Sequence, residues 1–328
     1  DFFAALPPGA TRTSAAFCRS QAPAQFPDPM CKQGRSSPLR KTLFLVRHGE
    51  ALHNVLEKDA RARGAAEAEA LGHPPGSDIH SVLVEAARRA VLEDAYLHDA
   101  GLSSAGKAEA MAARTEIEAL TSISEAGTLS RLPRLPWPTA VFSSPLQRTL
   151  QTTAIIFPEH PGTHIREFLR ERRTGLPCDE RRLAPDIRKR PSFMHMSITD
   201  LQKLDSECRC CEDVELEDKL KLRKRTACLA KHLRDLPDSC VCVVTHKGFL
   251  RELERGPFGR PDAPEFANCE VRVYEVLLED DGGMVSRLRY GGRHHQHSPE
   301  TRVAGMALQC APSEALQHEA VATPAAAA

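Results

Sequence analysis

An arginine and a histidine follow a short apolar run, and these residue types in that position suggest phosphate chemistry. Arg47 and His48 come directly after residues 43–46. In an open α/β sheet, ligands bind at the carboxyl ends of the strands. Arginine presents a planar fork of donors to phosphate oxygens, and a largely unprotonated histidine can act as a nucleophile. The pair suggests phosphoryl transfer through a phosphohistidine, and an ordinary surface turn is the alternative interpretation.

Two residues further along the chain could complete such a site. Arg148 stands in the first turn of an expected helix, where the helix N-terminus attracts anions and an arginine adds donors for phosphate. His246 follows the apolar run 240–245 and is a second histidine at the end of a buried strand. A solvated arginine and a hydrogen-bonded structural histidine are the alternatives for each alone. Two histidines at strand ends can lie on one rim of a sheet.

The elements that must position these residues alternate between strand and helix. We expect strands over 42–46, 140–142, 165–169 and 239–245, and a late hairpin of strands 271–278 and 285–290. We expect helices over 50–70, 79–96, 103–120, 144–157, 214–236 and 247–254, with an irregular segment over 174–206. Ser103 and Ser144 are expected helix caps, and Pro145 is expected at a first helical position. This alternation predicts an α/β fold with a mostly parallel central sheet and helices on both faces.

The composition is that of an ordinary globular protein, because 41% of the 328 residues are hydrophobic and 27% are charged. Basic and acidic residues balance at 44 each, so no global field points to nucleic acid or to a membrane surface. No apolar run approaches the roughly 18 residues that span a bilayer. We therefore expect no nucleic acid and no membrane partner, and a cytoplasmic protein. The oligomeric state is not indicated.

Both ends of the chain differ in composition from the middle. Residues 1–40 are rich in Ala, Pro and Ser and hold only two acidic residues, Asp1 and Asp28. This is typical of a disordered segment, and it is also compatible with the remnant of an organelle-targeting peptide. Residues 293–328 are first His-rich and then Ala-rich without apolar periodicity, which predicts a disordered tail. The expected domain spans residues 41–292.

Eleven cysteines are irregularly spaced, and they do not predict a metal centre. Cys240 and Cys242 lie in an apolar strand pattern and are expected in the core. Cys208, Cys210 and Cys211 lie in a polar stretch without a nearby second Cys/His pair at ligand spacing. We interpret them as exposed thiols in a loop, and a reducing compartment is the simpler assumption. We expect neither a metal nor another cofactor.

Five blocks of the sequence resemble the histidine phosphatase superfamily (branch 1), the phosphoglycerate mutase-like proteins, in the order in which that family has them. They are residues 45–54, 99–106, 143–153, 169–175 and 244–251, within a resemblance that extends over about 41–276. The other branch of the superfamily has an aspartate directly after the second histidine as its proton donor, whereas Lys247 stands there in this chain. The resemblance implies the three-layer phosphoglycerate mutase-like fold.

The resemblance also implies a role for each site residue. His48, Glu171 and His246 would be the catalytic residues, with His48 attacking phosphorus and Glu171 protonating the leaving oxygen before it activates water. The phosphoryl oxygens would be held by Arg47, Asn54, Arg148 and His246. No metal is needed in this scheme. The implied substrate is a small phosphorylated metabolite or another phosphoester.

Three functions remain open at this point. The first is a metal-independent phosphatase acting through a phosphohistidine on His48, the second is a phosphoglycerate-type phosphomutase, and the third is a non-catalytic binding protein. Residues 174–179 and the pair Gly248-Phe249 depart from the pattern of the glycolytic mutases, which favours a phosphatase. Residues 51–98 and 174–213 are expected to shape the substrate pocket. The basic stretch 181–190 could bind a second anionic group, although solvated surface is the favoured interpretation.

Overall fold

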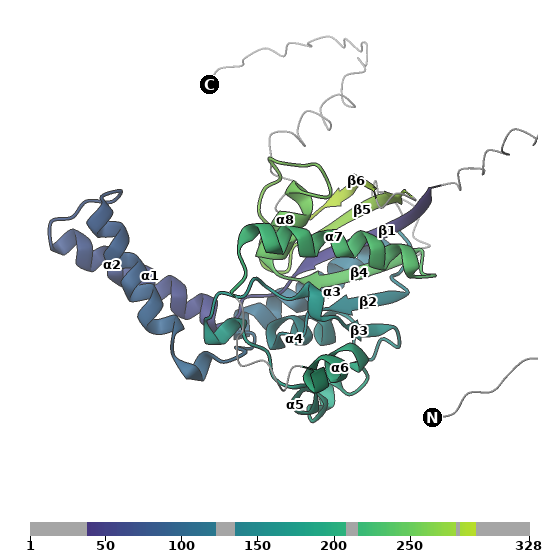
Figure 1. The fold of residues 1–328 in the computed structure, drawn as a ribbon, viewed down its shortest axis with the longest axis horizontal. Coiled ribbons are helices and arrows are strands. Elements are labelled where there is room, and N and C mark those ends of the chain that lie inside the picture. The colour runs from purple at the N-terminus through teal and green to yellow at the C-terminus, as the bar shows by residue number, and fades with distance from the viewer. Residues whose placement is uncertain (1–37, 123–134, 208–215, 280–282, 293–328) are drawn as a thin grey trace, which may run out of the picture. The chain divides into compact units, whose positions relative to one another are not determined.

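The computed structural model describes residues 38–122, 135–207, 216–279 and 283–292 (Figure 1). All of these described residues belong to one compact unit. The cluster Cys208, Cys210 and Cys211 and the expected tail 293–328 lie outside the described residues. The first strand begins at Leu39, so the last residues of the expected N-terminal segment belong to the sheet.

The described residues form one six-stranded sheet with the order β3-β2-β4-β1-β5-β6. Its strands are β1 (Leu39–Arg47), β2 (Ala140–Ser143), β3 (Thr163–Ile165), β4 (Cys240–Thr245), β5 (Val271–Leu278) and β6 (Met284–Gly291). The first four strands in this order are mutually parallel, whereas β5 and β6 add an antiparallel edge beside β1. The expected α/β class, the mostly parallel sheet and the late hairpin are confirmed.

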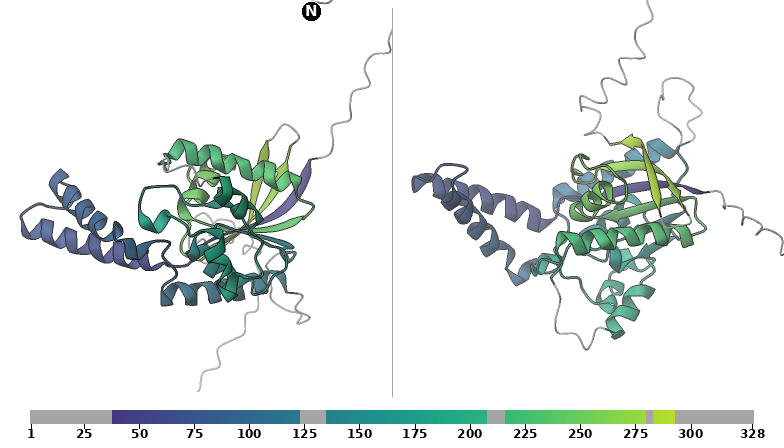
Figure 2. Two further views of the ribbon diagram at one scale, coloured as in Figure 1. Left: turned by 60° about the horizontal axis from the view of Figure 1, so that its bottom comes forward. Right: turned by 45° about the horizontal axis from the view of Figure 1, so that its top comes forward.

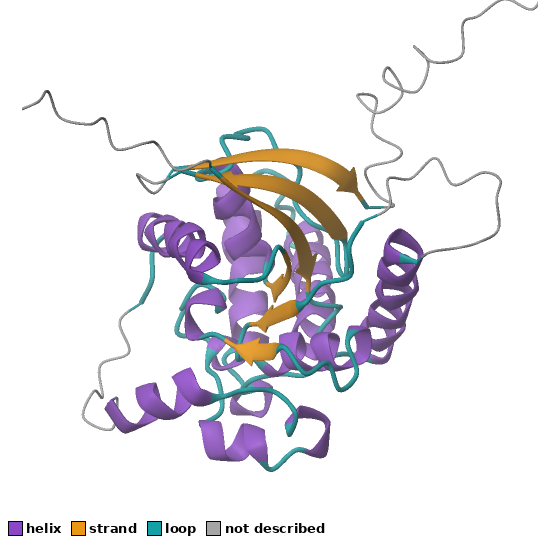
Figure 3. Cartoon of the chain, turned by 90° about the vertical axis from the view of Figure 1, so that its right-hand side faces the viewer, coloured by secondary structure: helices purple, strands orange, loops and turns teal. Residues whose placement is uncertain are grey.

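Helices cover both faces of the sheet (Figure 3). The α-helices are α1 (Leu52–Ala70), α2 (Asp78–Leu92), α3 (Ser104–Thr121), α4 (Gln147–Ile156), α5 (Ala184–Arg188), α6 (Thr199–Glu207), α7 (Lys219–Asp235) and α8 (Lys247–Arg255). Short 3-10 turns span Ala95–Leu97, Glu167–Leu169, Pro177–Asp179 and Pro191–Phe193. Ser103 caps α3 as expected, because its hydroxyl accepts a hydrogen bond from the amide of Gly106.

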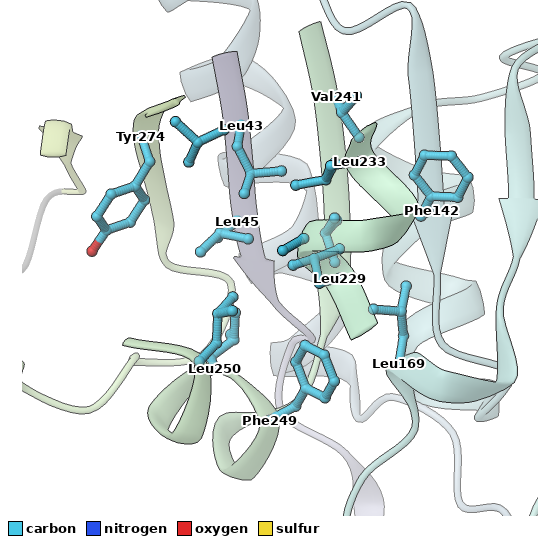
Figure 4. Packing of buried hydrophobic residues seen from close by; sticks show 14 of the residues in the cluster. Leu43, Leu45, Phe142, Leu169, Leu229, Leu233, Val241, Phe249, Leu250 and Tyr274 are labelled. Atoms are coloured by element: carbon cyan, nitrogen blue, oxygen red, sulfur yellow. The ribbon is translucent and has the colours of Figure 1, made fainter. Parts of the chain in front are cut away.

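The core has two halves because alternate residues of a strand point to opposite faces of the sheet. Leu43 and Leu45 of β1 pack with side chains of α7 and α8, as Figure 4 shows for Leu229, Leu233, Phe249 and Leu250. Phe44 and Val46 pack on the other face with side chains of α3 and α4. A strand that is buried on both faces must be apolar at every position, which is why β1 and β4 read as continuous apolar runs. Cys240 and Cys242 are buried core residues, as predicted.

Three local expectations were wrong. Helix α4 begins at Gln147 after Leu146, so Pro145 precedes the helix and Ser144 does not cap it. The expected strand 165–169 is instead the end of β3 followed by a 3-10 turn. The segment 174–206 is not irregular but holds α5, α6 and two 3-10 turns. These helices are too short to show apolar periodicity, and buried side chains such as Ile187, Phe193 and Leu201 hold them in a separate cluster.

Helices α1 and α2 form an antiparallel pair that follows the carboxyl end of β1 (Figures 1 and 2). Small side chains allow the two helices to approach closely, since a Cβ atom on Gly64 would come within 2.8 Å of the Ala87 Cβ. Glu57 of α1 accepts a hydrogen bond at 2.6 Å from the Arg88 Nε of α2. In the part of the chain that the structure describes, no helix combines the length and the apolar character that crossing a membrane requires.

Candidate active site

The register of two neighbouring strands brings the two predicted histidines together. Arg47 of β1 lies opposite Thr245 of β4 in a parallel pair, so the next residue of each strand is His48 and His246. Both side chains are buried, and their ring centroids are 5.1 Å apart. The expectation that two histidines at strand ends share one rim of the sheet is confirmed.

His48 has the protonation state and tautomer that a nucleophile needs. Its Nδ1 lies 2.7 Å from the carbonyl oxygen of Gly49 and must therefore carry the proton, which leaves the Nε2 lone pair available. Burial, and then the positive charges of Arg148 and Arg47, hold the pKa of His48 well below its ordinary value. The ring is therefore neutral near neutral pH and lines a cavity of about 310 Å³.

Two arginines line the same cavity, and neither guanidinium group has all of its donors hydrogen-bonded within the described chain. Arg148 is buried and donates to the Cys178 carbonyl oxygen at 2.6 Å and to the Asp179 carboxylate at 3.1 Å. Arg47 donates to the carbonyl oxygen of Phe266 at 2.8 Å. The Nε atoms of both arginines are buried without a hydrogen-bond partner in the described part of the chain. Such fixed, incompletely satisfied guanidinium groups suit an oxyanion.

His246 lies beside His48 but is not itself part of the cavity wall. Its Nε2 is 2.7 Å from the hydroxyl oxygen of Ser144, the residue that was expected to cap α4. Burial, followed by the charge of Arg148, holds the pKa of His246 well below its ordinary value. His246 is therefore neutral near neutral pH, and the two guanidinium groups carry the positive charge at this end of the cavity.

Glu171 lies on the cavity wall and is held by two backbone amides. The amide of Arg172 donates to its Oε1 at 2.9 Å, and the amide of Gly248 in the first turn of α8 donates to its Oε2 at 3.3 Å. A Cβ atom on Gly248 would lie 2.3 Å from the Glu171 Oε1, so only glycine leaves room for this carboxylate. The structure thus brings a carboxyl group into the cavity that holds His48.

Asn54 has a fixed amide orientation and a neighbour that the sequence reasoning missed. Its Oδ1 accepts from the amide of Ala51 at 3.1 Å, so its Nδ2 must face the Nε2 of His53, 3.0 Å away. His53 is only 7% exposed and also lines the cavity. The feature of the sequence that could have pointed to His53 is its position next to Asn54 in the block 45–54.

The cavity wall contains five of the six predicted site residues, all except His246. The basic stretch 181–190 does not line it. Arg181 instead forms ion pairs with Glu167 and Asp205. This favours the interpretation that the stretch 181–190 does not bind an anionic group of the substrate. The other cations that line the cavity are Arg88, Arg172, Lys247 and Arg251. Within the described ranges, no three His, Cys, Asp or Glu side chains are grouped as a metal-binding set.

The chain belongs to the histidine phosphatase superfamily (branch 1), which residues 94–289 match. The matched range includes Arg148, Glu171 and His246 and begins after the block that holds His48. No curated protein matches the sequence significantly.

Solved structures of low sequence identity are similar to this chain. A mycobacterial glucosyl-3-phosphoglycerate phosphatase in complex with VO3 is 16% identical, with a TM-score of 0.43 over 77% of this chain and 98% of that chain. A putative alpha-ribazole-5'-P phosphatase from Escherichia coli is 16% identical, with a TM-score of 0.42 over 77% and 96%. Phosphoserine phosphatase from Entamoeba histolytica is 17% identical, with a TM-score of 0.39 over 77% and 96%.

Proposed function

We propose that this protein is a metal-independent phosphatase that hydrolyses phosphate monoesters through a phosphohistidine on His48. The observation that carries the proposal is the neutral, buried His48, whose Nδ1 is tied to Gly49 while the ring lines a cavity shared with Arg47 and Arg148. A dianionic phosphate placed between these arginines would meet both positive charge and a nucleophile.

In the first chemical step, the Nε2 lone pair of His48 attacks phosphorus and the ester P–O bond breaks. Arg47 and Arg148 stabilise the charge on the phosphoryl oxygens. Glu171 gives its proton to the leaving alkoxide, so that the alcohol departs neutral. His246 is hydrogen-bonded to Ser144 and lies next to the His48 ring without lining the cavity.

In the second step, the Glu171 carboxylate takes a proton from water, and the oxygen of that water attacks the phosphohistidine. The P–N bond breaks and its electron pair returns to the Nε2 of His48, while inorganic phosphate forms. Glu171 is thereby protonated again, and both residues are ready for another turnover. A mutase would differ only in the acceptor, because a second hydroxyl group would replace the water.

The test is hydrolysis of p-nitrophenyl phosphate in EDTA by the wild-type protein, His48→Ala and the control His98→Ala, whose side chain is exposed and does not line the cavity. We expect activity in EDTA that His48→Ala abolishes and His98→Ala retains. Acid-labile phosphate should be trapped on the wild-type protein and be missing from His48→Ala. Activity that survives in His48→Ala, or that is lost in EDTA and restored by a divalent metal, would refute the proposal.

A further inference from the structure

The cations of the cavity divide into those with an acidic partner and those without. Among the described residues, six cationic side chains line it. Four form ion pairs: Arg88 with Glu57 and Glu85, Arg148 with Asp179, Lys247 with Glu265, and Arg251 with Glu252 and Glu265. Within the described chain, Arg47 and Arg172 have no acidic partner. Arg47 belongs to the phosphate end beside His48, whereas Arg172 follows Glu171 and has no assigned task.

Arg172 lies where the main cavity meets a side cavity of about 180 Å³. Arg88, Arg172, Thr174 and Leu176 line both cavities, so the two adjoin. Arg88 uses its Nε for Glu57 and its Nη1 for Glu85, and its Nη2 makes no hydrogen bond to any described residue. Two guanidinium groups, from α2 and from the loop after Glu171, therefore offer donors at this junction.

We propose that Arg172, with the free Nη2 of Arg88, forms a second anion-binding site for a carboxylate or a further phosphate on the same substrate molecule. This inference rests on the proposed function and narrows it to phosphomonoesters that carry a second anionic group. The arginine fork suits a carboxylate and a phosphate equally well. The side cavity is the place for that group, and the cavity with His48 is the place for the phosphate that is removed.

The test is calorimetric binding to His48→Ala protein, which excludes turnover, with two matched pairs of ligands. 3-Phosphoglycerate and glycerol 3-phosphate differ only by a carboxylate in place of a hydroxymethyl group. Fructose 1,6-bisphosphate and fructose 6-phosphate differ by one phosphate. We expect the doubly anionic member of at least one pair to bind about tenfold more tightly, and the responding pair identifies the group. Equal affinities within both pairs would overturn the proposal.

The variant Arg172→Gln, made in the His48→Ala protein, tests whether Arg172 causes the difference in affinity within the responding pair. It should remove the difference within the responding pair and change the affinity for the singly anionic member by less than about twofold. Arg188→Gln is the matched control, because Arg188 is exposed and lines neither cavity. Equal weakening of both members by Arg172→Gln would refute a separate site. Activity that is lost in EDTA and restored by a divalent metal, by contrast, would refute the metal-independent phosphatase proposal and leave these binding results valid.

A second inference concerns His53 and rests on a separate observation. Because the amide of Asn54 is fixed by Ala51, its Nδ2 donates to the His53 Nε2, and the proton of the His53 ring must be on Nδ1. Burial, followed by the charges of Arg148 and Arg47, holds the pKa of His53 well below its ordinary value, so the ring is neutral. That buried Nδ1 has no hydrogen-bond partner in the described chain.

We infer that the Nδ1–H of His53 is a further donor to the phosphoryl group. A buried donor without a partner is unfavourable by about 1–3 kcal/mol, and an oxyanion in the cavity that His53 lines would satisfy it. The alternative is that His53 merely positions Asn54 through its Nε2. These two roles belong to different ring nitrogens and can be separated.

Two substitutions of His53 distinguish the roles of its two ring nitrogens. The amide nitrogen of His53→Asn stands close to the place of Nδ1, whereas the amide oxygen of His53→Gln stands close to the place of Nε2. We expect His53→Gln to weaken the binding of inorganic phosphate about tenfold and His53→Asn to weaken it about threefold or less, with melting temperatures that show both to be folded. The reverse order would assign His53 a positioning role, and wild-type affinity in both variants would exclude any contact; either result overturns the inference.

Discussion

The substitution Gly248→Ala should impair catalysis without impairing the fold. The added Cβ would lie 2.3 Å from the Oε1 of Glu171, whereas an ordinary contact is about 3.4 Å. The carboxylate must therefore move by about 1 Å, and it can, because it is the end of a flexible side chain. Gly248 lies in the first turn of α8, where alanine is the better helix former by about 0.5–1 kcal/mol. The melting temperature should not fall.

The size of the effect should depend on the leaving group. A misplacement of about 1 Å in a catalytic group can lower the rate roughly 100-fold, and general acid catalysis as a whole contributes about 10²- to 10⁴-fold. An alkyl phosphate needs the proton of Glu171, because its alkoxide is a poor leaving group. p-Nitrophenolate leaves without that help. We expect kcat/KM to fall about 100-fold for an alkyl phosphate and less than about tenfold for p-nitrophenyl phosphate.

The assay is kcat/KM for both substrates in wild type, Gly248→Ala, Glu171→Gln and the double variant. If the added methyl group acts through Glu171, the double variant should be no slower than Glu171→Gln alone. Full activity of Gly248→Ala on the alkyl phosphate would refute the reasoning. Equal losses on the two substrates would also refute it, because they would show a general disturbance of the cavity instead of a displaced acid.

Three other properties follow from the structure. The buried histidines of the site have lowered pKa values, so below about pH 6.5 the unfolded chain binds protons that the folded chain does not; the free energy of unfolding in urea should fall as the pH drops below 6.5, and a flat profile would contradict this. Arg272→Met removes a main ion-pair partner of the Glu254 carboxylate, which stays buried. This should lower the free energy of unfolding by about 3–5 kcal/mol. A loss below about 1 kcal/mol in a denaturant titration would contradict this expectation. Ser144→Ala removes the hydrogen bond to the buried His246 ring and should lower kcat/KM about 3- to 10-fold and the free energy of unfolding by about 1–3 kcal/mol; wild-type kinetics would show that this bond does not position the ring.

The strands that are buried on both faces were predictable from the sequence. The positions of the two histidines at the carboxyl ends of these strands were therefore predictable as well. Continuous apolar runs mark β1 and β4, and a histidine is the first residue after each strand. Glu171 carries no comparable signal, because it follows a 3-10 turn and reaches the cavity through a contact with Gly248, 77 residues away. Only the family resemblance singled it out. Pairing across such a distance depends on tertiary packing, which local patterns do not encode.

The start of α4 shows the same limit at a smaller scale. A serine followed by a proline is a common helix start, and the segment predicted one at residue 144. The structure instead commits the hydroxyl of Ser144 to His246, and the helix begins only after Leu146. A local rule failed here because His246, a buried histidine directly after β4, competes for the same hydroxyl. Such a conflict between local and tertiary preference is expected at a functional site.

The helix pair α1–α2 forms part of the wall of the main cavity as well as packing together. Asn54 and Glu57 of α1 and Arg88 of α2 all line the main cavity, and the ion pair between Glu57 and Arg88 joins the helices at its wall. Glu57 and Glu85 accept from the Nε and the Nη1 of Arg88, and its Nη2 makes no hydrogen bond to a described residue. A change anywhere along the close contact of Gly64 with Ala87 would move α2 relative to α1. The second anion site should respond to such a change before the phosphate site does, because Arg47, His48 and Arg148 are held by the sheet and α4.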